Sequence, residues 1–227
     1  MIGNGIPVAD PWVLLAAVAQ ATERVAIGPM VTPVPRRRPW VLARQAATVD
    51  HLSDGRLILG VGTGFPADVE FGTFNEPTSD RERAERLDEG LAIIQGIWSG
   101  EPFAYQGAHF QVRQTSFAPR PLRPIPIWVA GMWPNRAPFR RAARYNGAYP
   151  IADDFHRLSV AEISEIAAYL DRFRTGSGPY DIVIGGHRPS GRQISEYEAA
   201  GVTWCMVGPA EGEPLGKFTE LVARGPS

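Results

Sequence analysis

Three alternating glycines follow a short apolar run, in a position where bare main chain is able to bind a flat or phosphorylated ligand. The stretch is SDGRLILGVGTGF, residues 53–65, with glycine at 60, 62 and 64. A dinucleotide fingerprint needs a further glycine where Phe65 stands, at the opening of a helix, and two prolines follow instead. The glycines therefore either end a strand in a tight turn or expose backbone to a flat ligand. We favour the second, because ligands bind at the carboxyl ends of parallel strands.

Charged side chains follow two other apolar segments. Arg36, Arg37 and Arg38 stand in one such loop, and Asp153 and Asp154 in another. Consecutive guanidinium groups either bind a phosphate or an anionic cofactor tail through bidentate hydrogen bonds or form a solvated loop. The aspartates either contact substrate or cap the next helix. We predict Arg36 and Asp153 as substrate contacts.

A helix start offers a third candidate site. The run AGMWPNRAPFRRAARY follows an apolar segment and begins a helix at about Pro134. Free backbone N–H groups and the positive end of the helix dipole attract anions at such a start. The alternative is an ordinary capped helix with a solvated arginine face.

Histidine and cysteine do not form a recognisable catalytic or metal site. His51 ends a predicted helix, His109 lies in a predicted hairpin, and His187 follows a predicted strand, where a ligand could reach it. No pair has metal-ligand spacing, so we predict no metal. Cys205 lies in the apolar run VTWCMVG and is predicted to be buried, since one cysteine forms no internal disulfide.

Predicted helices and strands alternate along the chain. Helical spacing predicts helices at 11–22, 39–52, 80–98, 135–145, 159–173, 192–200 and 213–223, and short β-branched runs predict strands at 24–34, 56–61, 125–130, 147–151, 180–184 and 202–207. This alternation is typical of a parallel α/β sheet. Residues 101–117 alternate apolar and polar residues around Gln106-Gly107, which predicts a small inserted hairpin. Periodicity alone does not distinguish an incomplete barrel from a doubly wound sheet.

Composition favours a small-molecule ligand. The net charge is −1 and the pI is near 6.4, which gives no reason to expect nucleic acid or an anionic membrane as a partner. A length of 227 residues with 44% hydrophobic content is consistent with a single domain over residues 1–227. The start lacks a basic segment followed by an apolar stretch, and no run approaches the about eighteen apolar residues of a membrane span, so we expect a cytoplasmic protein.

Three stretches together resemble the bacterial luciferase-like monooxygenase superfamily, whose members use flavin or deazaflavin. They are ATERVAIGPMVTPVPRRRPWVLARQAATVDHLSDGRLILGVGTGF, RAERLDEGLAIIQGIWSGEPFAYQGAHF and PRPLRPIPIWVAGMWPNRAPFRRAARYNGAYP. The resemblance implies a TIM (β/α)8-type barrel with the isoalloxazine ring at its C-terminal mouth. Residues 24–33 resemble the third strand and residues 56–64 the fourth. The expected barrel is therefore incomplete, with about six parallel strands and without the first two.

The resemblance also implies where the cofactor binds. The GVGTG segment matches the end of the fourth strand, beside the flavin, and GPMVTP matches a bulge in the third strand. Many deazaflavin relatives hold a non-proline cis peptide in that bulge, which by position would join Pro29 and Met30. The cofactor phosphate would lie near the turn after the fifth strand. The implied cofactor-binding residues are Met30, Thr32, Gly62, Thr63, Gly64, Ala130, Gly131, Trp133, Asn135 and Arg136.

Two departures from the family leave the catalytic residues unassigned. Deazaflavin-dependent sugar-phosphate dehydrogenases of the superfamily follow GVGTG with a glutamate that serves as catalytic acid, and this sequence has Phe65 there. We expect Phe65 either to contact an apolar substrate or to pack in the core. The catalytic histidine of luciferase-like enzymes ends the second strand, which this chain lacks.

The resemblance implies an oxidoreductase that acts on a small organic substrate. Either reduced FMN, supplied by a flavin reductase, activates oxygen for a monooxygenase reaction, or a reduced deazaflavin transfers hydride. A homodimer is expected by the same resemblance. One alternative is a non-catalytic flavin-binding or partner-dependent truncated barrel, with exposed strand edges. Another is a flavin-free phosphate-ester or sugar enzyme, which no metal ligands or paired carboxylates support.

Overall fold

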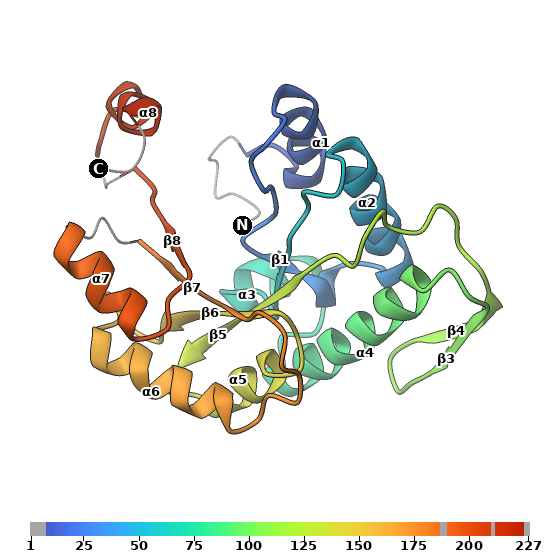
Figure 1. Ribbon diagram of the computed structural model, residues 1–227. Coiled ribbons are helices and arrows are strands. Elements are labelled where there is room, and N and C mark those ends of the chain that lie inside the picture. Colours follow the sequence, from blue (N-terminus) through green and yellow to red (C-terminus); the bar gives the residue numbers. More distant parts are fainter. Residues whose placement is uncertain (1–7, 187–189, 210–211, 225–227) are drawn as a thin grey trace. The chain divides into compact units, whose positions relative to one another are not determined.

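The computed structural model describes residues 8–186, 190–209 and 212–224, so His187 lies outside the described residues. The chain divides into two compact units, one up to Ile127 and one from Trp128 onward (Figure 1). No helix in the described ranges is long and apolar enough to cross a membrane.

The first unit contains a short parallel strand pair, three long helices and a hairpin. Its elements are α1 (Pro11–Ala21), β1 (Thr32–Pro33), η1 (Val34–Arg36), α2 (Pro39–Leu52), β2 (Leu59–Gly62), α3 (Ala67–Glu70), η2 (Gly72–Phe74), α4 (Asp80–Trp98), β3 (Phe103–Gln106) and β4 (Gln111–Thr115). β1 and β2 are parallel, and Thr32 lies opposite Val61. Their carboxyl ends therefore open at the same edge, which carries the loops that contain the arginines and the glycines.

Local sequence signals explain where these helices begin. Asp10 caps α1, because its carboxylate accepts hydrogen bonds from the backbone N–H groups of Trp12 and Val13 at 2.9 and 3.0 Å. Proline occupies the first position of α1 and of α2, where its missing N–H costs nothing. α4 begins after Ser79, whose hydroxyl accepts a hydrogen bond from the backbone N–H of Glu82. The predicted helices at 39–52 and 80–98 are confirmed at both ends.

Arg56 joins the end of α1 to the beginning of β2. Its guanidinium donates to the carbonyls of Ala19, Thr22 and Val25 at 2.9, 2.7 and 2.8 Å, and to the hydroxyl of Thr22 at 2.9 Å. Its Nε donates to the carbonyl of Ser53 at 2.6 Å. One side chain therefore satisfies the carbonyl groups that are left free where α1 and α2 end.

Replacement of Arg56 by methionine is expected to lower the free energy of unfolding by roughly 3 kcal/mol, because several carbonyls lose a charged donor at once. Chemical denaturation followed by far-UV circular dichroism measures the change. The matched control is Arg113→Met, at an exposed position of β4. Equal stability of the two variants would contradict the role given to Arg56.

The predicted strand at 24–34 is mostly not a strand. Only Thr32 and Pro33 form β1, preceded by an isolated bridge between Ile27 and Leu57. Proline donates no hydrogen bond to a ladder, and Pro29 and Pro33 interrupt this segment. A non-proline cis bond occurs here as the resemblance implied, but it joins Met30 to Val31 rather than Pro29 to Met30.

The predicted inserted hairpin is confirmed. β3 and β4 pair in antiparallel, with Gln106 opposite Gln111. Glu89 of α4 anchors the turn, because its carboxylate accepts from the backbone N–H groups of Ala108, His109 and Phe110 at 2.7 to 3.2 Å. This anchor brings Phe110 to the face of α4 that also carries Arg86.

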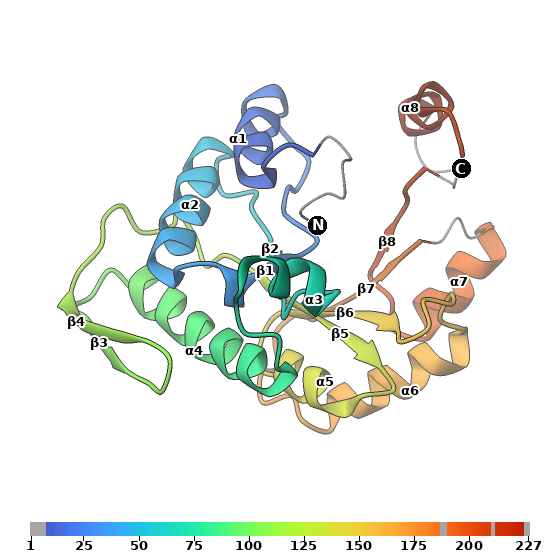
Figure 2. The ribbon, with the colours of Figure 1, turned by 180° about the vertical axis from the view of Figure 1, so that it is seen from behind.

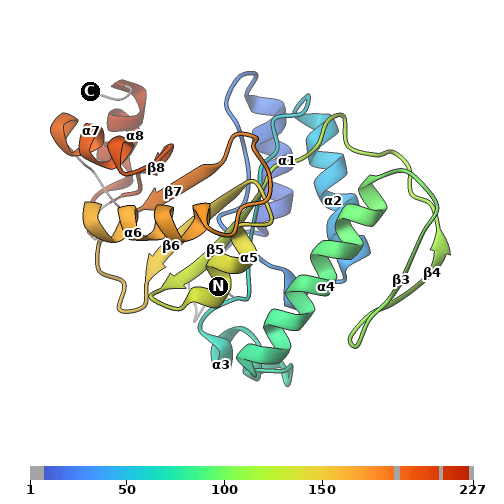
Figure 3. The same cartoon turned by 60° about the horizontal axis from the view of Figure 1, so that its bottom comes forward.

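The second unit alternates strands with helices. Its elements are β5 (Ile127–Trp133), α5 (Arg136–Ala142), β6 (Gly147–Ala152), α6 (Val160–Asp171), β7 (Asp181–Gly185), α7 (Gly191–Ala199), β8 (Trp204–Met206) and α8 (Leu215–Arg224). The strands pair in parallel in the order β5, β6, β7, β8. Figure 3 shows α5 and α6 along one side of these strands. With β1 and β2, the described ranges hold six strands in parallel pairings, against eight in a closed barrel.

The prediction that Cys205 is buried is wrong. Cys205 is exposed, and Trp204 beside it is 42% exposed. β8 is the outer strand of the second unit and pairs there with β7. An apolar run predicts burial only when both faces of its strand are covered. Trp204 instead packs edge-on against Trp128 at 5.3 Å and donates to the carboxylate of Asp181.

Candidate functional site

The loop at the end of β2 brings backbone partly to the surface. Gly62 is buried, Thr63 and Gly64 are half-buried, and Phe65 is 55% exposed, so Phe65 does not pack in the core. Figure 2 shows the single turn of α3 that follows this loop. Main chain without a large side chain is therefore accessible where the sequence predicted a ligand.

Packing as well as conformation requires glycine at position 64. Its φ of +87° lies in the left-handed region. A Cβ added there would lie 2.7 Å from Cε2 of Phe71 and 3.1 Å from Cβ of Pro33. One side of Gly64 is thus filled by the protein itself, and a ligand has access only to the other side.

Arg83 of α4 holds this loop in place. Its side chain is 4% exposed and its Nη1 donates to the carbonyls of Thr63 and Gly64 at 3.2 and 2.5 Å. Its Nε donates to the carbonyl of Thr78 at 3.3 Å, and Nη2 pairs with Asp80. Sequence reasoning assigned this residue no role in the site. The available signal was its spacing, since Arg83 lies on the buried face of α4 with Leu87 and Leu91.

A buried ion pair lies on the far side of the same loop. Arg36, predicted as a substrate contact, forms an ion pair with Glu70, which is 3% exposed. Burial lowers the pKa of the Arg36 guanidinium, and the charge of Glu76 opposes that effect. Arg36 and Arg83 both lie over the ring of Phe71, at 6.0 and 5.2 Å from its centroid. Arg36 is therefore already engaged in holding α3.

The hydroxyl of Thr32 is buried without a hydrogen-bond partner in the structure. Thr32 is 2% exposed and lies opposite Val61, one residue before Gly62. A buried hydroxyl without a partner costs free energy, on the order of 1–3 kcal/mol. Met30, two residues earlier, is half-buried. Its Sδ atom would lie 2.9 Å from a Cβ added at Gly60, so Met30 lies against β2. Thr32 and Met30 therefore lie beside β2, and their role in cofactor binding stays a prediction.

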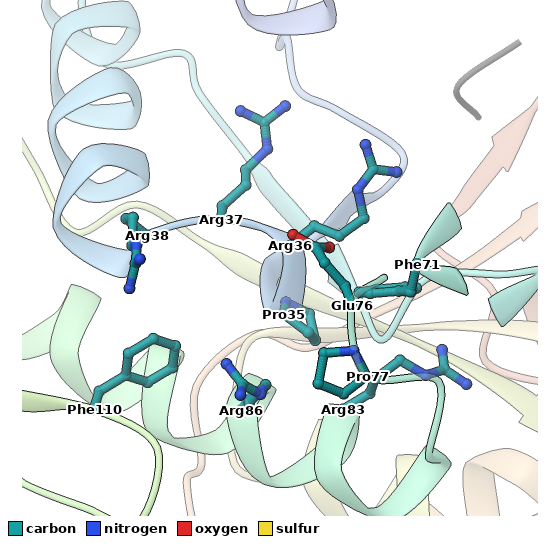
Figure 4. A pocket seen from close by; sticks show the side chains of 10 residues that line it. All are labelled: Pro35, Arg36, Arg37, Arg38, Phe71, Glu76, Pro77, Arg83, Arg86 and Phe110. Atoms are coloured by element: carbon teal, nitrogen blue, oxygen red, sulfur yellow. The ribbon is translucent and has the colours of Figure 1, made fainter. Parts of the chain in front are cut away.

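A pocket of about 190 Å³ lies beside the three consecutive arginines (Figure 4). It is lined by Pro35, Arg36, Arg37, Arg38, Phe71, Glu76, Pro77, Arg83, Arg86 and Phe110. Five of these residues carry a positive charge and one a negative charge. The loop after β1 thus lines a cavity, as ligand-binding loops do, although Arg36 itself is paired within the protein.

The remaining predicted cofactor residues lie in the second unit. Ala130, Gly131 and Trp133 belong to β5, where Gly131 lies opposite Pro150 of β6. A Cβ added at Gly131 would lie 2.4 Å from Cβ of Pro138. This glycine therefore permits the close approach of α5 to β5.

The turn after β5 carries a side-chain cap and an ion pair. The Asn135 side chain caps α5 and accepts from the N–H of Ala137 at 3.1 Å. Arg136 stacks 3.7 Å from the ring centroid of Trp133 and donates to Glu165 at 2.7 Å. α5 is a capped helix of seven residues, and a phosphate at its start would have to compete with Glu165 for Arg136.

Asp153 and Asp154 follow β6, and both are exposed. Asp153 donates its backbone N–H to the carbonyl of Trp133 at 3.0 Å. Asp154 contacts His156: the Nδ1 atom of His156 lies 2.5 Å from Oδ1 of Asp154. The other ring nitrogen of His156, Nε2, lies 3.0 Å from Oε1 of Glu162. The sequence analysis did not consider His156, and the only available signal was its position after a strand.

Hydrogen bonds to carboxylates raise the pKa of His156, with Asp154 as the main cause. The pKa of Asp154 is lowered, first by the hydrogen bond from the backbone N–H of His156 and then by the bond to its ring. A raised folded-state pKa stabilises the protein below the unfolded value near 6.5, and that contribution is lost as pH rises through the folded pKa. The lowered folded-state pKa of Asp154 stabilises the protein above the unfolded value of about 4, and that contribution is lost as pH falls through the folded pKa. The pair therefore stabilises the fold most between pH about 4 and about 6.5.

An NMR titration of His156 should give a midpoint above 6.5, and Asp154→Asn should lower it. The matched control is Asp153→Asn, which removes the neighbouring carboxylate. A midpoint that falls equally in both variants would show that general surface charge, and not this contact, shifts the pKa.

The structure groups the predicted residues by unit. Met30, Thr32, Gly62, Thr63, Gly64, Phe65 and Arg36 lie around the β1 and β2 ends in the first unit, and Ala130, Gly131, Trp133, Asn135, Arg136 and Asp153 around the β5 and β6 ends in the second. Among the described residues, no group of His, Cys, Asp and Glu could hold a metal ion.

Comparison with known sequences gives a consistent result. The sequence model of a family described as luciferase-like monooxygenase matches residues 2–206. An uncharacterized protein of Mycobacterium tuberculosis is 31% identical over 224 residues, which cover 96% of this chain and 73% of the relative. An F420-dependent glucose-6-phosphate dehydrogenase of Beutenbergia cavernae is 38% identical over 135 residues, 59% of this chain. The match covers 39% of that dehydrogenase.

Solved structures share the fold. An F420-dependent secondary alcohol dehydrogenase in complex with an F420-acetone adduct has a TM-score of 0.73 at 15% identity, over 89% of this chain and 79% of its own. The oxygenating constituent of 3,6-diketocamphane monooxygenase from Pseudomonas putida, in complex with FMN, has a TM-score of 0.62 at 19% identity, over 78% and 52%. These similarities confirm the expected α/β barrel type of fold.

Proposed function

The chain belongs to the luciferase-like monooxygenase family, and from that premise we propose that it is an oxidoreductase that binds FMN or a deazaflavin at the end of β2 and acts on a small organic molecule. The observation that carries the proposal is the loop of Thr63 and Gly64, whose partly exposed main chain is held rigid by Arg83. A family that includes both F420-dependent and FMN-containing proteins supports either cofactor.

The residues at this edge fit a planar heterocycle in two respects. Gly64 is half-buried and has no side chain, so part of its main chain is exposed, while Phe71 and Pro33 fill the space on its other side. Thr32 adds a buried hydroxyl that has no hydrogen-bond partner within the part of the chain that the structure describes. A polar edge of a bound ring would satisfy this hydroxyl and remove its desolvation cost.

When bound, the cofactor supplies the redox chemistry, either oxygen activation by reduced FMN or hydride transfer by a reduced deazaflavin. The chain binds and orients it. Thr32, Thr63 and Gly64 contact the ring in this proposal. Met30, which precedes β1, and Gly62 at the end of β2 support them. The half-exposed ring of Phe65 provides an apolar surface that excludes water beside the substrate.

The second group, from Ala130 to Arg136, is proposed to bind the cofactor phosphate. Arg136 is the charged donor of this group, and it is held by Glu165 and stacked on Trp133. When the phosphate binds, it would replace the Glu165 carboxylate as the partner of the Arg136 guanidinium, which is already oriented. Glu165→Gln should therefore tighten cofactor binding in this proposal.

The proposal is tested by titration of the purified chain with FMN and, separately, with coenzyme F420, followed by the change in cofactor fluorescence. Saturable binding of one of them, with turnover of the reduced form by oxygen or by an oxidised substrate, is the expected result. Turnover with NADH, FMN and an added flavin reductase would identify the oxygen-dependent reaction. Absence of saturable binding for both cofactors would contradict the proposal.

A further inference from the structure

The arginine-lined pocket of the first unit contains positive charge that the protein does not neutralise. Arg36 pairs with Glu70, and Arg83 pairs with Asp80 and with backbone carbonyls. Within the residues that the structure describes, Arg38 forms no ion pair. Its guanidinium lies 5.9 Å from the ring centroid of Trp40. One full charge is thus available at the pocket wall.

Arg86 supplies a second charge from a different element. Its pair with Glu82 spans 2.9 Å, but the two side chains are 28% and 33% exposed. The Arg86 guanidinium is therefore partly accessible to solvent, and an anion in the pocket is able to contact it beside Glu82. Because Arg86 projects from α4 and Arg38 precedes α2, the two guanidinium groups reach the pocket from separate helices.

An apolar surface lies beside the two arginines in the pocket. Phe110 packs edge-on against Trp40 at 6.3 Å between centroids, and Arg86 lies 5.9 Å from the Phe110 ring. Figure 4 shows Arg38 and Arg86 directed toward the space beside Phe110, with Pro35 and Pro77 on the adjoining wall. The pocket therefore combines two cationic donors with an aromatic and proline surface.

We propose that this pocket binds a small organic anion, with its phosphate or carboxylate between Arg38 and Arg86 and its apolar part against Phe110. Guanidinium groups bind such oxyanions through paired, charge-assisted hydrogen bonds. Arg36 and Arg83 hold the walls through their own ion pairs, and so Arg38, which forms no ion pair among the described residues, and the half-buried Arg86 contact the ligand. This site goes beyond the proposed function and its binding needs no cofactor.

Two sources could supply the same chemistry. The anion is either a separate small molecule or the anionic end of a cofactor whose ring binds elsewhere. The shared group is an oxyanion attached to an apolar or extended body. Binding is therefore measured first without cofactor, so that failure of this site and failure of the proposed function remain distinguishable.

The test is isothermal titration of the full chain with phenyl phosphate, benzoate and inorganic phosphate. We expect phenyl phosphate to bind more tightly than inorganic phosphate, with an affinity that falls as salt rises. Arg38→Gln and Arg86→Gln should each weaken binding by about tenfold or more, and the exposed Arg113→Gln should leave it unchanged. Thermal unfolding checks that all three variants fold.

Cofactor titrations then identify the source. If phenyl phosphate competes with the cofactor and Arg38→Gln weakens cofactor binding, the pocket holds the cofactor's anionic end. If phenyl phosphate binds the cofactor-saturated chain with unchanged affinity, the ligand is a separate anion. Either result supports an anion site. Absence of phenyl phosphate binding, or an equal loss in Arg113→Gln, overturns it.

Discussion

Replacement of Gly64 by alanine is expected to abolish cofactor binding and to lower the free energy of unfolding by roughly 3 kcal/mol. The φ of +87° disfavours any side chain, and the new methyl group would lie 2.7 Å from the Phe71 ring. Phe71 is 1% exposed and packed under Arg36 and Arg83, so we expect the loop to move. Movement of the loop displaces the peptide groups that we propose to contact the ring.

The matched control for this prediction is Gly176→Ala. No atom lies within 4 Å of a Cβ added at Gly176, which is exposed. Chemical denaturation and cofactor titration are measured on both variants. An unchanged cofactor affinity in Gly64→Ala would contradict the proposed site, even if the variant were less stable.

Replacement of Arg83 by methionine is expected to lower the free energy of unfolding by about 3 kcal/mol and to weaken cofactor binding strongly. Methionine keeps much of the buried volume but leaves the carbonyls of Thr63, Gly64 and Thr78 without their charged donor. Arg83→Lys should restore part of the stability and less of the binding, since an ammonium group cannot reach all of these carbonyls in the same geometry.

Arg81→Met is the control for Arg83, because Arg81 is two residues away on the same helix. Its side chain is 89% exposed and forms an ion pair with Glu85. The melting temperature of this variant should match that of the unmodified chain. If Arg81→Met and Arg83→Met weakened cofactor binding equally, helix charge rather than loop geometry would be responsible.

Those parts of the fold that depend on local signals were predictable from the sequence. α2 and α4 begin and end where the helical spacing placed them. The hairpin followed from its alternation around Gln106-Gly107. The prediction of a strand at 24–34 was wrong because two prolines remove hydrogen-bond donors from the strand pairing. The prediction that Cys205 is buried was wrong because the covering of an outer strand depends on tertiary structure.

The candidate site was predictable only in outline. The sequence places Thr63 and Gly64 at the end of a strand, but it does not show that Arg83, nineteen residues beyond Gly64, donates to that loop. The sequence shows three consecutive arginines. It does not show that Arg36 forms an ion pair with Glu70 while Arg38 forms none among the described residues. Partners distant in sequence decide which charges remain available.

The central claim is that the cofactor ring lies against the main chain at the end of β2. Hydrogen–deuterium exchange of the chain, with and without saturating FMN or coenzyme F420, tests this claim most directly. We expect slower exchange in the peptide that covers residues 59–66 when the cofactor is bound. Slowed exchange elsewhere, with residues 59–66 unchanged, would contradict it.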